Sequence, residues 1–190
     1  KGGLTYDQDE YWEANIAKYV RFKNHLMLSH DGKELIKGKF GSKVKRWDIA
    51  SGKALMEYAG HKKSVLCYDL SKDGKQMVTG GGDGKLILWD VASGDSIYAL
   101  QSYREPILDV HFNEDETQVV SSSWDGTMKI HDLKAGKRLH YIEFKENGSA
   151  YNVLWGPGDL YLITSQGNVL KMWETDSHVQ VREFLGHADL

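Results

Sequence analysis

A glycine-rich run is the first candidate for chemistry in this sequence. Residues 80–85 read Gly-Gly-Gly-Asp-Gly-Lys, a composition that can cradle a phosphate group. A phosphate-binding loop needs a strand before it, a helix after it, and a Ser or Thr directly after the lysine. Here Lys85 is followed by Leu-Ile-Leu-Trp, which reads as a strand. The run is therefore predicted to be a turn without phosphate chemistry.

The other residue types that support catalysis or metal binding lack the required spacing. The serines at 121–123 are outside the Gly-x-Ser-x-Gly context of a nucleophile elbow. The eight histidines show no His-Glu-x-x-His pattern. Cys67, the only cysteine, lies in an apolar run and is interpreted as a small core residue. No catalytic residue, metal ligand or cofactor is predicted, and the chain is expected not to be an enzyme.

A strict repeat runs through the chain. Four aromatic residues are spaced 42 residues apart: Trp47, Trp89, His131 and Trp173. An acidic residue comes directly after each of them: Asp48, Asp90, Asp132 and Glu174. A period of about 40–45 residues that carries a Trp-Asp pair is typical of a β-propeller blade.

The second repeat shows which elements must carry these residues. Four short strands are expected at 65–70, 76–79, 85–90 and 97–100, because turns rich in Gly, Asp and Ser separate them. Both faces of the strand at 85–90 are apolar, which suits a sheet packed between two neighbours. The repeats show no convincing helical periodicity, so almost no helix is expected.

The chain resembles the WD-repeat family over nearly its whole length. The Trp-Asp pairs carry the resemblance, together with the Gly-His dipeptides at 60–61 and 186–187. It implies an all-β propeller in which a Trp, a Ser or Thr, a His and an Asp tie each blade together. Only the second repeat has this full set, as His61, Thr79, Asp83 and Trp89. The resemblance thus implies a structural role for His61 and Asp83, not a catalytic one.

The third repeat departs from the set that the resemblance implies. It keeps Ser121 and Asp125, but His131 stands in place of the Trp and Tyr103 in place of the His.

The first and fourth repeats depart in other ways. The first keeps Trp47, with Lys37 and Gly41 at the polar positions. The fourth keeps Trp173, with Thr164 one residue out of register.

The period also predicts how the chain is divided. Four repeats are expected at 21–60, 61–102, 103–144 and 145–185, and residues 186–190 would start a further one. Residues 1–20 are interpreted as part of a preceding blade or as an N-terminal extension. Propellers usually have 4–8 blades, and seven blades at this period need about 300 residues. Four complete blades with partial repeats at both ends are therefore expected to be a slice of an about seven-bladed ring. A two-chain ring and an open fragment remain alternatives.

Composition narrows the classes of partner. The chain has 24 basic and 27 acidic residues and a net charge of −3, so it lacks the basic excess of a general nucleic-acid-binding surface. No signal peptide or apolar membrane-spanning stretch is present in the sequence shown. A single cysteine gives no disulfide framework, which favours an intracellular location, in the cytoplasm or nucleus. Partners are expected to be proteins, with no small-molecule substrate and no membrane, and nucleic acid only indirectly.

The loops at one end of the blades are the predicted place for partners, because the resemblance implies binding on that face. Tyr, Trp and Arg are enriched in binding hot spots, which favours Trp124, Arg104 and Tyr103. Tyr103 and Arg104 stand where a regular repeat has Gly-His, so no structural role is expected for Tyr103. Lys62 and Phe40 lie in neighbouring loops and complete the prediction.

These observations predict a non-catalytic protein-interaction scaffold within a larger complex. Besides a propeller fused to a catalytic or transport domain outside this sequence, two alternatives stay open. One is a substrate receptor of a cullin-type ubiquitin ligase, which in this family often uses an Arg two residues after Trp-Asp. The corresponding positions are Ala50, Ala92, Lys134 and Asp176, and none is Arg. The other is a WD-repeat protein of the spliceosome, of RNA processing or of a kinase scaffold.

Overall fold

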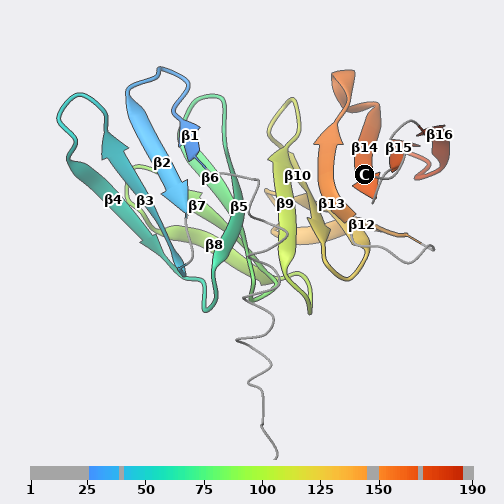
Figure 1. Cartoon of the computed structure of the whole chain (residues 1–190), viewed down its shortest axis with the longest axis horizontal. Coiled ribbons are helices and arrows are strands. Elements are labelled where there is room, and N and C mark those ends of the chain that lie inside the picture. Colours follow the sequence, from blue (N-terminus) through green and yellow to red (C-terminus); the bar gives the residue numbers. More distant parts are fainter. Residues whose placement is uncertain (1–25, 39–40, 145–149, 167–168, 186–190) are drawn as a thin grey trace, which may run out of the picture.

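The computed structural model describes residues 26–38, 41–144, 150–166 and 169–185. These residues form four antiparallel sheets of four strands each, and neighbouring strands in every sheet are consecutive in the chain. The sheets follow one another in chain order from blue to red (Figure 1). The all-β prediction is therefore confirmed.

Each sheet is built from one continuous segment. The first sheet contains β1 (Leu26–Leu28), β2 (Glu34–Gly38), β3 (Lys43–Asp48) and β4 (Ala54–Ala59). The second contains β5 (Val65–Leu70), β6 (Gln76–Gly81), β7 (Lys85–Asp90) and β8 (Ser96–Gln101). The third contains β9 (Ile107–Phe112), β10 (Gln118–Ser123), β11 (Thr127–Asp132) and β12 (Lys137–Glu143). The fourth contains β13 (Ala150–Trp155), β14 (Tyr161–Gln166), β15 (Val169–Glu174) and β16 (Gln180–Phe184).

The strands expected in the second repeat are found with small changes at their ends. Those at 65–70 and 85–90 coincide with β5 and β7, whereas 76–79 and 97–100 lie inside the longer β6 and β8. A 3₁₀ turn, η2 (Pro157–Asp159), is the single helical element among the described residues. Within that part of the chain, no helix has the length and apolar character needed to cross a membrane.

Turn residues fix where the strands begin and end. In the turn between β5 and β6, the Ser71 hydroxyl accepts the backbone N–H of Gln76 at 2.9 Å and donates to Asp73 Oδ1 at 2.8 Å. Gly74 has φ +71°, a left-handed conformation that glycine adopts without steric cost. The Ser-x-Asp-Gly spelling therefore determines this turn locally.

The core lies between neighbouring sheets. Buried side chains of the first sheet, including Ile36, Val44 and Tyr58, form one cluster with Met77 and Trp89 of the second. Similar clusters lie between the second and third sheets and between the third and fourth. Because both faces of a middle sheet are covered, β7 is buried at all four of its central positions.

The outer strand of each sheet reaches over the next sheet. The ring of Tyr58 on β4 meets Trp89 edge-on at a centroid distance of 5.7 Å, and its hydroxyl donates to the Val91 carbonyl at 2.9 Å. Phe144, just after β12, meets Trp173 in the same way at 5.5 Å. The outer strand thus covers the aromatic residue of the following sheet.

The last sheet has no such cover in the described part of the chain. Every residue of β16 is exposed, and exposed apolar side chains include Leu154, Leu170, Val181 and Phe184. Phe184 is 42 residues after Ile142, which is buried against the fourth sheet. The ring is not closed within the described residues.

Candidate functional site

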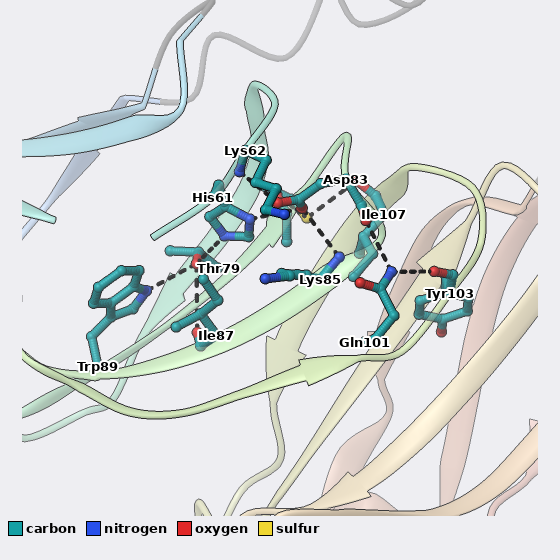
Figure 2. A network of polar contacts seen from close by, with 12 residues as sticks. His61, Lys62, Thr79, Asp83, Lys85, Ile87, Trp89, Gln101, Tyr103 and Ile107 are labelled. Carbon is teal, nitrogen blue, oxygen red and sulfur yellow. Dashed lines mark hydrogen bonds and ion pairs between the residues drawn. The ribbon is translucent and has the colours of Figure 1, made fainter. Parts of the chain in front are cut away.

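Four side chains of the second sheet meet in one hydrogen-bonded set. Trp89 Nε1 on β7 donates to Thr79 Oγ1 on β6 at 2.9 Å, and His61 Nε2 lies 2.7 Å from the same oxygen. His61 Nδ1 lies 2.9 Å from Asp83 Oδ1. Figure 2 shows the indole nitrogen of Trp89 and the imidazole of His61 both directed at Thr79. If Nδ1 donates to the carboxylate, Nε2 accepts from the Thr79 hydroxyl, and every polar atom of the set is satisfied.

Asp83 is held in its ionised form by this set. Burial raises the pKa of its carboxyl, but hydrogen bonds from His61 and from the backbone of Lys62 and Lys85 outweigh it, so the pKa is lowered. The backbone N–H of Lys62 donates to Oδ2 at 2.7 Å. A carboxylate whose acceptor sites are taken up by fixed neighbours stabilises the turn and is poorly placed to move protons.

Glycine is required where this set is most crowded. A Cβ added at Gly81 would lie 2.3 Å from His61 Nδ1 and 2.5 Å from Asp83 Oδ1. A Cβ added at Gly60 would lie 2.8 Å from Trp89 Cη2. The glycine-rich run and the Gly-His dipeptide thus allow close approach of backbone and side chains.

In the third sheet, Tyr103 has a structural role that the sequence did not predict, because the residue expected to face partners is buried. The side chain is only 3% exposed, and its hydroxyl donates to the Ser121 carbonyl at 2.8 Å and lies 2.9 Å from Ser121 Oγ. Tyr103 therefore replaces the His, because its longer side chain carries a polar group to the same strand. Burial raises the pKa of its hydroxyl well above the usual value.

A lysine side chain completes the polar contacts around Tyr103 in the third sheet. Lys129 Nζ lies 3.7 Å from the centroid of the Tyr103 ring and donates to the Ser102 carbonyl. Ammonium groups in this position are attracted by the negative face of the ring.

His131 occupies the Trp position of the third sheet with fewer contacts. It is 1% exposed, and its Nε2 lies 2.7 Å from Ser102 Oγ. Its Nδ1 is buried and has no hydrogen-bond partner among the described residues. Burial, aided by Lys129 and Arg138, lowers the pKa of His131 to about 4. The ring is therefore neutral near pH 7.

The fourth sheet restores the Trp contact despite its shifted sequence. Trp173 Nε1 donates to Thr164 Oγ1 at 3.0 Å. Leu162 pairs with Trp173, 11 residues later, whereas Met77 pairs with Trp89, 12 residues later. The connection between β14 and β15 is one residue shorter, so the one-residue offset of Thr164 is compensated.

The first sheet lacks the bond. Lys37 is exposed and Gly41 has no side chain, so the half-buried Trp47 has no hydrogen-bonded polar partner among the described residues.

The acids after the aromatic residues hold the next turn. Asp90 Oδ1 accepts the backbone N–H of Ser93 at 2.8 Å, and Asp48 Oδ1 accepts that of Ser51 at 2.8 Å. Asp132 Oδ1 accepts that of Ala135 at 2.6 Å. Glu174 binds the Ser177 hydroxyl instead, at 2.5 Å. Each acid therefore shapes the turn before the outer strand.

Sequence reasoning missed a polar cluster on the inner strands. Asp69 on β5 accepts the backbone N–H of Phe112 at 2.9 Å, and Asp109 on β9 accepts that of Val153 at 3.1 Å. His111 lies between the two carboxylates, 3.5 Å from Asp69 and 3.3 Å from Asp109. Burial opposes its protonation, but hydrogen bonds to both acids raise the pKa of His111 to about 9. The 42-residue spacing of Asp69 and His111 within apolar runs is the signal that could have revealed this link between sheets.

Two of the residues predicted to bind partners lie on adjoining loops. The backbone N–H of Trp124 donates to the Pro106 carbonyl at 3.0 Å, which joins its turn to the loop of Arg104. Arg104 is exposed, and its guanidinium has no ion-pair or hydrogen-bond partner among the described residues. Trp124 is half-buried against Leu66 and Leu108.

The other two residues differ. The Lys62 side chain is exposed. Its backbone N–H donates to Asp83, beside which it lies in Figure 2. Phe40 lies outside the described residues. Asp125, beside Trp124, uses Oδ1 for Thr127, and its Oδ2 accepts no hydrogen bond within the described part of the chain. This end of the second and third sheets thus carries cations, an aromatic ring and a carboxylate on adjoining loops.

Comparison with known proteins agrees with this arrangement. A family model described as WD domain, G-beta repeat, matches residues 52–90 and 94–132. Each match covers the outer strand of one sheet and the first three strands of the next, from β4 to β7 and from β8 to β11. No curated protein sequence matches the chain at a significant level. The described residues contain no group of three or more His, Cys, Asp or Glu side chains placed to hold a metal.

Proposed function

We propose that the chain is a non-catalytic scaffold that binds other proteins within a larger intracellular complex, because it carries WD repeats at 52–90 and 94–132. WD-repeat domains generally act as protein-interaction modules. The proposed contact surface is the loop pair 102–106 and 123–126, together with Lys62 on the neighbouring loop. We call this surface the loop patch.

One observation carries the proposal: Arg104, a hot-spot residue type, is exposed without an ion-pair or hydrogen-bond partner among the described residues, on the loop that adjoins the turn of Trp124. In the second sheet the equivalent positions are Lys62 and Gly82, and Asp83 accepts the Lys62 backbone N–H. The third sheet lacks this bond, and the Arg104 side chain projects without an internal partner. Aromatic and Arg side chains at such positions contribute most of the binding energy in many interfaces.

The test is a double substitution, Trp124→Ala with Arg104→Ala, in the full polypeptide. Affinity for a partner identified by cross-linking in its native complex should weaken by more than about 1 kcal/mol. Lys137→Ala is the matched control, because Lys137 is an exposed cation at the start of β12, away from the loop patch, with no ion-pair or hydrogen-bond partner among the described residues. The double variant and the control variant should have similar unfolding midpoints. Unchanged affinity for every recovered partner would remove the loop patch from the proposal.

The uncovered face of the fourth sheet supports the part of the proposal that concerns a larger ring. In the first three sheets, the outer strand packs on a following sheet. By the 42-residue period, Phe184 corresponds to Tyr58 and Ile142, both buried, yet it is 43% exposed. A further sheet with an aromatic side chain on its third strand would cover it. On the same 42-residue period, we also propose the repeat boundaries 21–60, 61–102, 103–144 and 145–185.

The ubiquitin-ligase alternative has weaker support. The adaptor contact in such ligases often uses an Arg two residues after the Trp-Asp pair. Of the four corresponding positions in this chain, only Lys134 is cationic. A lysine is a poor substitute for an arginine that makes two parallel hydrogen bonds. Recovery of a cullin adaptor with the native protein would favour this alternative over a general scaffold.

A further inference from the structure

Two cations stand at equivalent places on neighbouring loops of the loop patch. Lys62 and Arg104 are 42 residues apart. Each directly follows a side chain that is bonded to the second strand of its sheet, His61 in one loop and Tyr103 in the other. In the first and fourth repeats the corresponding residues are not cationic, so the repeat places this pair on these two loops.

The backbone of both loops is fixed against one turn of the second sheet. The Lys62 N–H donates to Asp83 Oδ2 at 2.7 Å. On the other loop, the Tyr103 N–H donates to the Gly84 carbonyl at 3.0 Å. Gln101 Nε2 links the turn to this loop, because it donates to the Asp83 carbonyl at 3.0 Å and to the Tyr103 carbonyl at 2.8 Å, as Figure 2 shows. Both cationic side chains therefore start from fixed points, and binding costs little ordering of the loops.

The two cationic groups have no anionic partner of their own. The side chains of Lys62 and Arg104 are exposed, and neither makes an ion pair or a hydrogen bond among the described residues. The nearby carboxylates are engaged elsewhere: Asp83 accepts from His61 and from two backbone N–H groups, and Asp125 Oδ1 accepts from its own turn. The charges of the lysine and the arginine are thus open to a binding partner.

We propose that Lys62 and Arg104 together receive an acidic side chain of the partner protein, either a carboxylate or a phosphorylated residue. Ammonium and guanidinium groups form their strongest hydrogen bonds with the oxygens of these anions. Trp124, on the adjoining turn, is half-buried on Leu66 and Leu108, so its ring offers apolar surface next to the loop of Arg104. This inference rests on the proposed function, because it names the chemistry of the partner at the same surface.

Two pairs of substitutions with equal changes in charge separate this surface from general electrostatics. Lys62→Glu with Arg104→Glu reverses the proposed pair, while the backbone N–H of residue 62 can still donate to Asp83. Lys53→Glu with Lys137→Glu is the matched control, since these exposed lysines lie at the other end of the sheets, next to β4 and β12. Lys62→Gln with Arg104→Gln removes the two charges without repelling Asp83, and it provides the test if the reversed variant unfolds.

The experiment measures binding of labelled peptides to the full polypeptide by fluorescence anisotropy at low ionic strength. The peptides have one length, and Gly alternates in them with Glu, phosphoserine or Gln. Wild type and the control pair should bind the Glu or the phosphoserine peptide alike, and both Lys62 and Arg104 pairs should bind it at least about tenfold more weakly. The Gln peptide should bind at least about tenfold more weakly to the wild type. The tighter of the two anionic peptides identifies the class of acid.

Two results would overturn the proposed acid-binding pair. One is an anionic peptide that fails to bind the wild type, and the other is a loss of affinity that is as great for the control pair as for the Lys62 and Arg104 pairs. Failure of the loop patch itself is measured separately with the native partner. If Trp124→Ala with Arg104→Ala weakens that partner while the anionic peptides fail to bind, the surface stands and its partner is not acidic. If neither binding changes, both proposals fall.

Discussion

The second and third sheets solve the same structural problem with different side chains. In the second sheet, His61, Thr79, Asp83 and Trp89 form a closed set in which each polar atom has a partner. In the third, Tyr103 bonds Ser121 directly, and His131 is diverted to Ser102. One imidazole nitrogen then has no partner, and Asp125 is outside the set. The comparison shows that the position of a polar group between strands matters more than the identity of the residue that carries it.

The largest difference in the free energy of unfolding is expected at the repeated aromatic position, which is Trp89 in the second sheet and His131 in the third. Trp89→Ala should lower the free energy of unfolding by about 3–5 kcal/mol, because it removes a buried ring and the bond to Thr79. His131→Ala removes a smaller ring whose Nδ1 is already unpaired, so about 1–2 kcal/mol is expected. Urea denaturation of both variants measures the difference. Equal losses of stability would mean that the polar set of the second sheet stabilises the fold no more than that of the third sheet.

The central hydroxyl gives the next largest contrast. Thr79→Val keeps the shape of the side chain but leaves Trp89 Nε1 and His61 Nε2 without their partner, so about 2–3 kcal/mol should be lost. Ser121→Ala should lose about 1 kcal/mol or less, because the Tyr103 hydroxyl still donates to the Ser121 carbonyl. Chemical denaturation again provides the measurement. A greater loss for Ser121→Ala would show that the third set is the more tightly coupled one.

The last expected contrast is the response to acid. The pKa of His131 is lowered to about 4 in the folded state, against about 6.5 for an ordinary histidine. The unfolded chain therefore binds a proton first as the pH falls from about 6.5 to 4, and stability decreases by roughly 2–3 kcal/mol over that window. The contribution is fully present above pH 6.5. His131→Leu should flatten this part of the stability curve, and an unchanged curve would assign the acid response to other groups.

The repeat itself was predictable because it is written in residue types that act locally. The Ser-x-Asp-Gly turn, the Trp-Asp pair and the alternation around β7 each determine a turn or a strand from a few neighbouring residues. The set around Thr79 followed from the family resemblance, because its residues stand at fixed spacings. Trp173 and Thr164 were harder to join, since the shorter connection between β14 and β15 is needed to restore the pairing.

Tyr103 shows where sequence reasoning fails. A tyrosine in a loop is a reasonable hot-spot residue, and its sequence gives no sign of burial. Its hydroxyl reaches Ser121, 18 residues away, only because β10 passes beneath the loop, and Lys129 covers the ring from β11. The contact depends on two later strands, so no local pattern reveals it.

The sequence by itself determined the repeated antiparallel sheets, the turns and the residues of the second polar set, since their spacing is a property of the chain alone. Only the tertiary structure decided which polar groups are satisfied. It buried Tyr103 and placed His111 between two carboxylates from neighbouring sheets. Among the described residues, it left His131 and His178 each with an unpaired nitrogen. The physical reason is that hydrogen bonding and burial depend on groups from 18 to 44 residues apart meeting within about 3 Å, and the packing of strands and sheets sets that meeting.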